Sequence, residues 1–206
     1  MRTNYQLVTD FNKAMGLAEP NAPVGFSSEQ QKKLRHDLIV EEAITERLEA
    51  READELYKVM DAHGDSLVVL YGEANDYKFD SDIVLAIVNY ANMSKVCKTP
   101  EEAHESVMAY GLGKHPDKMG EVLETHWDAV EVGGVDMFVV YNSLTGKGLK
   151  SVNFRPPEQD LKVYAKVLVS GAVDPEKLRT ILRNHGVEAL IESLYRVEQE
   201  LTNYKN

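Results

Sequence analysis

Two acidic clusters at helical spacing, each set among apolar residues, constrain this chain more than any other feature. The first cluster lies within residues 38–49 and the second within residues 61–70. Side chains three, four or seven residues apart lie on one face of a helix. The clusters therefore predict two acidic stripes, the first formed by Glu42, Glu46 and Glu49 with Glu41 beside it, the second by Asp61 and Asp65.

Antiparallel packing of these two helices would bring the stripes together. Carboxylates that face one another repel unless a cation lies between them, and oxygen-only ligands favour Mg²⁺ or Mn²⁺ over Zn²⁺. The alternative is a solvated acidic face, with Arg47 and Arg51 pairing with the glutamates at little net gain. The apolar residues 67–70 directly after Asp65 favour the first interpretation, because unpaired charge next to a buried face is costly.

Composition narrows the class of protein. A chain of 206 residues with 43% hydrophobic residues suits one domain, with or without an appendage. The formal net charge of −11 argues against nucleic-acid binding and against binding to an anionic membrane. The single cysteine, Cys97, permits no internal disulfide, and the sequence contains no signal-peptide-like or membrane-spanning apolar run. These features predict a soluble cytoplasmic protein.

Apolar periodicity predicts a mainly α fold with a small antiparallel β-meander. A Ser-Ser-Glu-Gln sequence at 27–30 and Thr99-Pro100 are helix-start signals, and a bend is expected near 52–54. Gly133-Gly134 and the turn at 145–148 would join the strands, and Gly186 would end a helix. The expected helices are 3–16, 28–51, 55–77, 81–92, 100–110, 159–169, 174–186 and 187–203, and the expected strands are 127–132, 135–141 and 149–154.

The order of several short motifs resembles one known family. The motifs are residues 8–16, 34–42 and 61–72, then Asn92-Met93-Ser94-Lys95 and residues 148–157. They are similar to the all-α nucleoside triphosphate pyrophosphohydrolases, which include MazG-like enzymes and phosphoribosyl-ATP pyrophosphohydrolase, and most of all to single-domain bacteriophage versions. The resemblance implies a family-like domain at 1–160, with a helical core at 3–110 and a β-meander at 125–157. Residues 161–206 would form a C-terminal helical extension.

The resemblance implies hydrolysis of a nucleoside triphosphate to a monophosphate and pyrophosphate, with Mg²⁺, or else Mn²⁺, as cofactor. Family members hold the metal on a Glu-x-x-Glu pair and a Glu-x-x-Asp pair. The implied ligands here are Glu41, Glu42, Glu46, Asp61 and Asp65, and either Glu41 or Glu42 would act as general base. The chain departs from the pattern at two positions, where glutamates are replaced by Thr45 and Lys58.

Five further residues are candidates for binding the substrate. Lys95 would approach phosphate and Asn92 phosphate or sugar, although both also suit a helix C-terminus. Arg35 lies about two turns before the first acidic cluster, where a solvated arginine is the alternative. Lys147 and Lys150 would close over the triphosphate from the β-meander, but lysines also protect exposed strand edges.

Two other functions are open at this stage. The departures at Thr45 and Lys58 suit a nucleotide-binding or sequestering protein without turnover, and the acidic surface with its extra helices suits an interaction protein. The resemblance also implies a homodimer or homotetramer, and location in the host cytoplasm if the chain is phage-encoded.

Overall fold

The computed structural model describes residues 3–17, 25 and 28–203. It confirms a mainly α fold with a two-stranded antiparallel sheet. The chain divides into two compact units, Met1–Leu85 with Val163–Asn206, and Ala86–Lys162. The family-like domain expected at 1–160 is based on sequence likeness and stays a prediction. No helix in the described ranges is long and apolar enough to cross a membrane.

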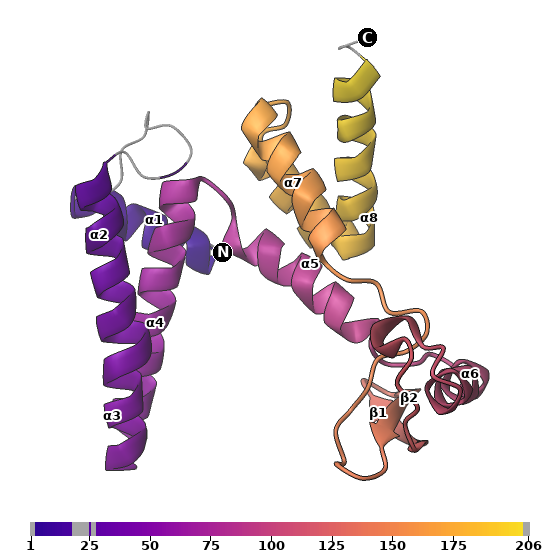
Figure 1. Ribbon diagram of the computed structural model, residues 1–206. Coiled ribbons are helices and arrows are strands. Elements are labelled where there is room, and N and C mark those ends of the chain that lie inside the picture. The colour runs from indigo at the N-terminus through magenta and orange to yellow at the C-terminus, as the bar shows by residue number, and fades with distance from the viewer. Residues whose placement is uncertain (1–2, 18–24, 26–27, 204–206) are drawn as a thin grey trace. The chain divides into compact units, whose positions relative to one another are not determined.

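A helical hairpin dominates the first unit. One arm is continuous through α2 (Glu29–Leu38), the π-helix η1 (Ile39–Thr45) and α3 (Glu46–Ala53), and the other arm is α4 (Leu56–Tyr77), which lies beside it (Figure 1). The Ser28 hydroxyl caps α2 by accepting from the N–H of Gln31 at 3.1 Å, whereas Ser27 lies outside the described residues. Asp54 turns the chain in the left-handed conformation, at φ 51°, as the expected bend requires.

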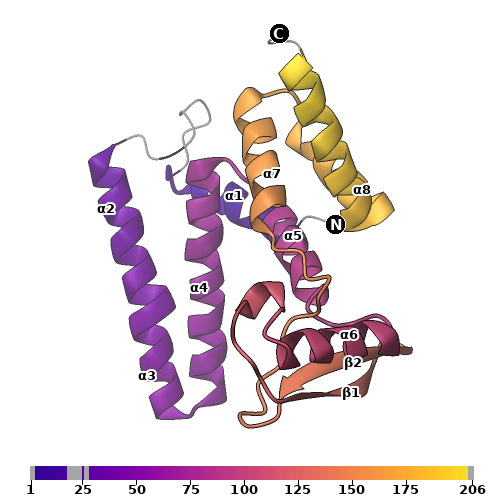
Figure 2. The ribbon, with the colours of Figure 1, turned by 45° about the vertical axis from the view of Figure 1, so that its right-hand side comes forward.

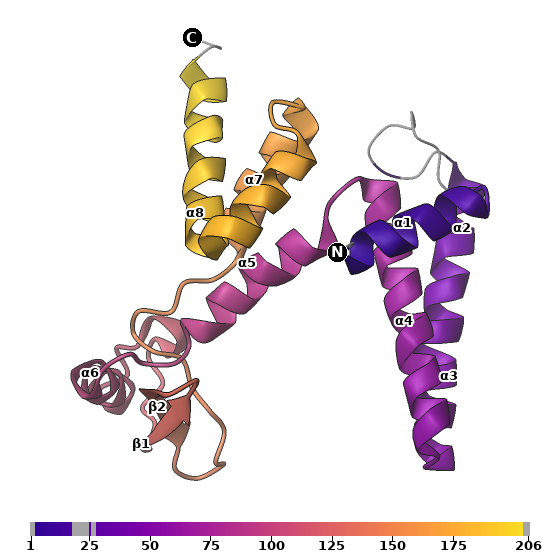
Figure 3. The ribbon, with the colours of Figure 1, turned by 180° about the vertical axis from the view of Figure 1, so that it is seen from behind.

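Small side chains let the two arms approach. Ala50 of α3 is buried, and so are Ala62 and Ser66 of α4. Helix α1 (Asn4–Ala14) packs across α4 (Figure 3), where the Thr9 hydroxyl contacts the Asn75 amide oxygen at 2.6 Å. The hairpin thus holds the two acidic stripes on neighbouring helices, as the sequence predicts.

The C-terminal helices complete the first unit. Helix α7 (Glu158–Ser170) contributes the buried Val163 and Val167, and α8 (Pro175–Asn203) contributes the buried Leu190 and Leu194. Gly186 interrupts α8 at φ 84° and ψ −179°, so the expected break into two helices is confirmed. A side chain is strained in this left-handed region, which explains the glycine.

A buried polar network ties these helices to the start of α5 (Ser81–Met93). The Asp80 carboxylate caps α5 by accepting from the N–H of Asp82 at 2.8 Å, and it pairs with the Arg179 guanidinium. The Tyr164 hydroxyl accepts from the N–H of Asp80 at 3.1 Å, and burial raises the pKa of Tyr164 to about 12.

We expect Tyr164→Phe to lower the free energy of unfolding by about 1–3 kcal/mol, because it leaves the buried Asp80 N–H without its acceptor. Urea denaturation followed by circular dichroism measures the change. Tyr57→Phe, at an exposed position on α4, is the matched control and should stay within about 0.5 kcal/mol of the parent. Equal effects at both positions would contradict the role of the Tyr164 hydroxyl.

The second unit packs α6 (Pro100–Gly111) against a β-hairpin (Figure 2). Strands β1 (Thr125–Val132) and β2 (Val135–Asn142) are joined at Gly133-Gly134, whose φ values of 62° and 82° fit the expected two-residue turn. Thr99 caps α6, as predicted. The buried apolar residues of this core are Cys97, Ala103, Tyr110 and Val140.

The expected third strand at 149–154 is wrong. Among the described residues, the pairing extends beyond the hairpin only as isolated bridges, between Phe138 and Cys97 and between Tyr141 and Gly148. Of the following segment, the N–H of Leu149 still donates to the Val140 carbonyl of β2 at 2.7 Å. The N–H of Ser151 instead donates to the Lys95 carbonyl at 2.9 Å, and that of Val152 donates to the Ser106 hydroxyl at 3.0 Å. Since these groups are already paired with the end of α5 and with α6, they cannot form a ladder with β2.

Candidate functional site

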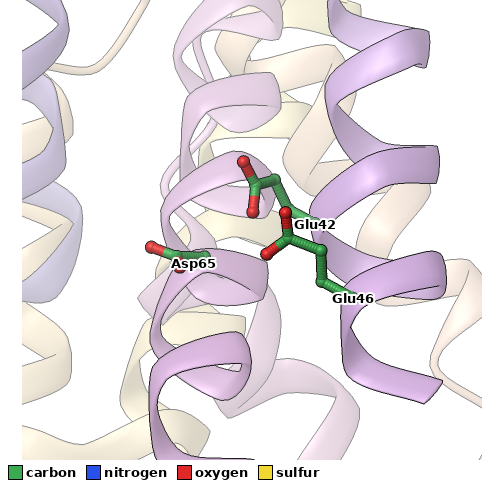
Figure 4. Close-up of side chains that lie close together, drawn as sticks. All are labelled: Glu42, Glu46 and Asp65. Atoms are coloured by element: carbon green, nitrogen blue, oxygen red, sulfur yellow. The ribbon is translucent and has the colours of Figure 1, made fainter. Parts of the chain in front are cut away.

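Three carboxylates converge between the arms of the helical hairpin. Glu42 of the π-helix, Glu46 of α3 and Asp65 of α4 each offer an oxygen atom, and these three atoms all lie within 4.8 Å of one another. Figure 4 shows the three side chains close together, Glu42 and Glu46 on one helix and Asp65 on the facing helix. The structure therefore brings together three of the five residues for which a metal-binding role was predicted.

The electrostatics of this cluster are unfavourable without a cation. Desolvation by burial raises the pKa of Glu42, and the neighbouring negative charges of Glu46, Asp65 and Glu41 raise it further. In the described part of the chain, no basic side chain forms an ion pair with Glu42, Glu46 or Asp65. The alternative in which arginines neutralise the stripe is therefore not observed at these three carboxylates.

The donor set fits a hard divalent cation. All three donors are carboxylate oxygens, which is the ligand chemistry that Mg²⁺ and Mn²⁺ prefer, and no His or Cys donor joins them in this cluster. Three carboxylates leave further coordination positions of a six-coordinate ion for water or phosphate. Glu42, Glu46 and Asp65 are thus the residues that would hold the ion.

The other two predicted ligands, Glu41 and Asp61, lie outside the convergent set. Glu41 is exposed and close enough for its charge to act on Glu42. Asp61 lines an open pocket of about 350 Å³ together with Glu46 and Lys58. Lys58 is a positively charged residue at a position where the resemblance implies a carboxylate, and its ammonium pairs with Glu55 at 2.6 Å.

Arg35 is buried rather than directed at the acidic cluster. Its Nε donates to Asp76 Oδ2 of α4 at 2.7 Å, and both side chains are almost wholly shielded, at 7% and 4% exposure. Gln31 donates to the other Asp76 oxygen at 3.0 Å. The guanidinium passes directly over Gly72. The geometry gives Arg35 a role in joining α2 to α4, and its role in substrate binding stays a prediction.

The second unit gathers three of the predicted substrate-binding residues. The Lys95 ammonium donates to the Asn92 amide oxygen at 2.7 Å and lies 5.9 Å from the centre of the Phe154 ring. The Lys150 ammonium lies 4.5 Å from the same ring and pairs with Asp117 at 2.5 Å. Two cations thus lie close to one aromatic ring, and a cation–π contact of this kind is worth about 0.5–1 kcal/mol at an exposed site.

Lys147 is the exception among the substrate-binding candidates. Its side chain is exposed, and its backbone carbonyl accepts from the N–H of Asn142 at 2.9 Å in the turn after β2. Sequence reasoning missed the roles of Phe154 and Asp117, because Phe154 is far in sequence from Lys95 and Asp117 is far from Lys150.

Comparison with known proteins gives a family match for the part of the chain that carries the three convergent carboxylates. Residues 8–92 match the sequence model of the phosphoribosyl-ATP pyrophosphohydrolase family. The matched segment includes Glu42, Glu46 and Asp65, and it ends at Asn92. No curated protein matches the chain. The match supports pyrophosphohydrolase activity on a nucleotide.

Proposed function

We propose that this chain, whose residues 8–92 form a domain of the all-α nucleoside triphosphate pyrophosphohydrolase superfamily, is a Mg²⁺-dependent enzyme that hydrolyses a ribo- or deoxyribonucleoside triphosphate to the monophosphate and pyrophosphate. The observation that carries the proposal is the convergence of Glu42, Glu46 and Asp65 from two facing helices. Mn²⁺ is expected to substitute for Mg²⁺, because both ions prefer oxygen ligands.

The chain's own carboxylates take distinct parts in this proposal. A bound divalent cation supplies neutralisation of phosphate charge and lowers the pKa of water. Glu42, Glu46 and Asp65 hold the ion, and Glu41, exposed beside them, orients the attacking water as general base. The place of Glu42 among the three convergent carboxylates supports Glu41 rather than Glu42 as the base.

Release of pyrophosphate from a panel of nucleoside and deoxynucleoside triphosphates tests this function. We expect release with Mg²⁺ or Mn²⁺ and none after chelation, because the three carboxylates cannot neutralise phosphate charge by themselves. The absence of pyrophosphate with both ions across the whole panel would contradict the proposal.

A nucleotide-binding protein without turnover is the second candidate. Two observations favour it. Lys58, which pairs with Glu55, is a cation at a position where the resemblance implies a carboxylate, and Asp61 lies outside the convergent set. Calorimetry with non-hydrolysable triphosphate analogues separates the two functions. Tight binding of the analogue, combined with no pyrophosphate from the corresponding substrate, would select this candidate over the enzyme.

We also propose that the hairpin associates with a second copy of the chain. Each arm leaves apolar side chains exposed at helical spacing: Ile44 and Leu48 on one arm, Leu56 and Met60 on the other. Exposed apolar surface of this kind is characteristic of interaction sites in soluble proteins. Oligomerisation would bury it while leaving the acidic stripes between the two arms.

We expect the protein to have a solution mass that is a multiple of 23.2 kDa, measured by light scattering after size exclusion. Leu48→Glu should shift it to the monomer, because a charge at a buried interface is costly. Leu144→Glu, at an exposed position after β2, is the control and should leave the mass unchanged. A monomeric parent protein would contradict the proposed association.

A further inference from the structure

The helix that carries Glu42 and Glu46 is not a regular α-helix at this point. Residues Ile39–Thr45 form a π-helix, in which backbone N–H groups bond to carbonyls five residues back instead of four. The N–H of Glu46 donates to the Glu41 carbonyl, and the Thr45 hydroxyl donates to the Val40 carbonyl at 2.9 Å. A turn closed in this way holds one more residue than an α-helical turn. The arm therefore contains an extra residue without losing its continuity.

The extra residue has a direct consequence for the ligands. In an α-helix each residue advances the side-chain direction by about 100°, so an added residue would rotate every later side chain by that amount. The wider π-turn absorbs the addition. Glu46, four residues after Glu42, therefore takes the place that the third following residue has in a regular helix. Ala50, one turn later, remains buried and lines the same pocket as Ala62 of α4.

A second contact holds the π-helix against the facing arm. The Ser66 hydroxyl is buried, 2.7 Å from the carbonyl oxygen of Ala62 in its own helix and 3.2 Å from the carbonyl oxygen of Glu42 in the π-helix. Ser66 directly follows the ligand Asp65 and touches the backbone of the ligand Glu42. It therefore fixes the two ligand-bearing backbones relative to each other.

We infer that the π-helix sets the register of the cation ligands, with Thr45 as the inserted residue and with Thr45 and Ser66 as positioning residues. Glu46 is then the functional equivalent of the carboxylate that the resemblance implies at position 45. The carboxylate that is missing at position 45 is therefore present one residue later, at Glu46, and the π-turn compensates for the shift. This inference rests on the proposed function, because it concerns ligands of the same cation.

Moving the carboxylate and removing the insertion give opposite expectations. Deletion of Thr45 converts the π-turn to an α-turn and keeps Glu46 facing Asp65, so Mn²⁺ affinity should stay within about threefold of the parent, since ligand geometry is retained. Thr45→Glu combined with Glu46→Ala restores the family spacing in sequence but leaves the π-turn in place. This double variant should bind Mn²⁺ about 10- to 100-fold more weakly, because its carboxylate at position 45 no longer faces Asp65.

Mn²⁺ binding is measured on the full chain by electron paramagnetic resonance and calorimetry, with helical content followed by circular dichroism. A double variant that binds like the parent, beside a deletion variant that does not, would overturn the inference while leaving the proposed function intact. A parent protein that binds no Mn²⁺ would overturn both.

Substitutions that keep the chain length provide a second test if the deletion variant fails to fold. Thr45→Val removes the hydroxyl bond to Val40 at almost constant shape, whereas Thr45→Ser retains it. We expect weaker Mn²⁺ binding by about 3- to 10-fold for the valine variant and recovery for the serine variant, within the range seen for residues that orient metal ligands. Equal affinities of the two variants would overturn the positioning role of Thr45.

Discussion

Replacing Asp65 by Asn is expected to lower Mn²⁺ affinity at least about 100-fold, because loss of residues that merely orient metal ligands already costs 10- to 100-fold. Asp65 is the only member of the convergent set contributed by α4, so its loss leaves both remaining ligands on one arm of the hairpin. Pyrophosphate release should fall below detection in the same variant. Calorimetric titration with Mn²⁺ and the pyrophosphate assay measure the two effects.

Stability separates a lost ligand from a damaged fold in this experiment. In the absence of metal, Asp65 faces two other carboxylates, and its charge contributes to the raised pKa of Glu42. Asp65→Asn removes that repulsion, so the metal-free variant should be as stable as the parent or more stable. Glu52→Gln, on the exposed surface of α3, is the control and should retain both binding and turnover. Normal Mn²⁺ affinity in Asp65→Asn would contradict the proposed site.

The positions of the acidic stripes could be predicted from sequence because they depend on local periodicity. Asp61 and Asp65 lie in an uninterrupted helix, where a spacing of four residues places side chains on nearly one face. The π-helix could not be predicted in this way, because the four-residue spacing of Glu42 and Glu46 also fits a regular α-helix. Whether an added residue becomes a wider turn depends on tertiary contacts such as that of Ser66 with Glu42.

The same distinction between local preference and tertiary contacts explains why the strand predicted at 149–154 is wrong. The turn at Gly133-Gly134 follows from local conformational preference, and it was predicted correctly. The segment 149–154 has the composition of a strand, but beyond Leu149 its Ser151 and Val152 N–H groups donate to residues 95 and 106, far away in sequence. Strand propensity describes a residue's fit to a pleated surface, and it does not specify what the backbone will pair with.

Loss of the buried pair between Arg35 and Asp76 is expected to be the most destabilising change in the hairpin. Among the described residues, Arg35→Met leaves the Asp76 carboxylate, which is 4% exposed, with the Gln31 amide as its one side-chain partner. It should lower the free energy of unfolding by about 3–5 kcal/mol. Urea denaturation measures the change. Gly72→Ala should act through the same pair, because its Cβ would lie 2.4 Å from Nη1 of Arg35.

The double variant Arg35→Met with Asp76→Leu decides between the two roles of Arg35. Replacing a buried ion pair with apolar residues of similar volume is often neutral or stabilising, so most of the lost stability should return. If Arg35 only joins α2 to α4, the recovered variant should keep the KM of the parent for its triphosphate substrate. A raised KM with recovered stability would show that Arg35 also contacts phosphate. A single variant that loses less than about 1 kcal/mol would contradict the burial of the pair, because that is the typical range for solvent-exposed ion pairs.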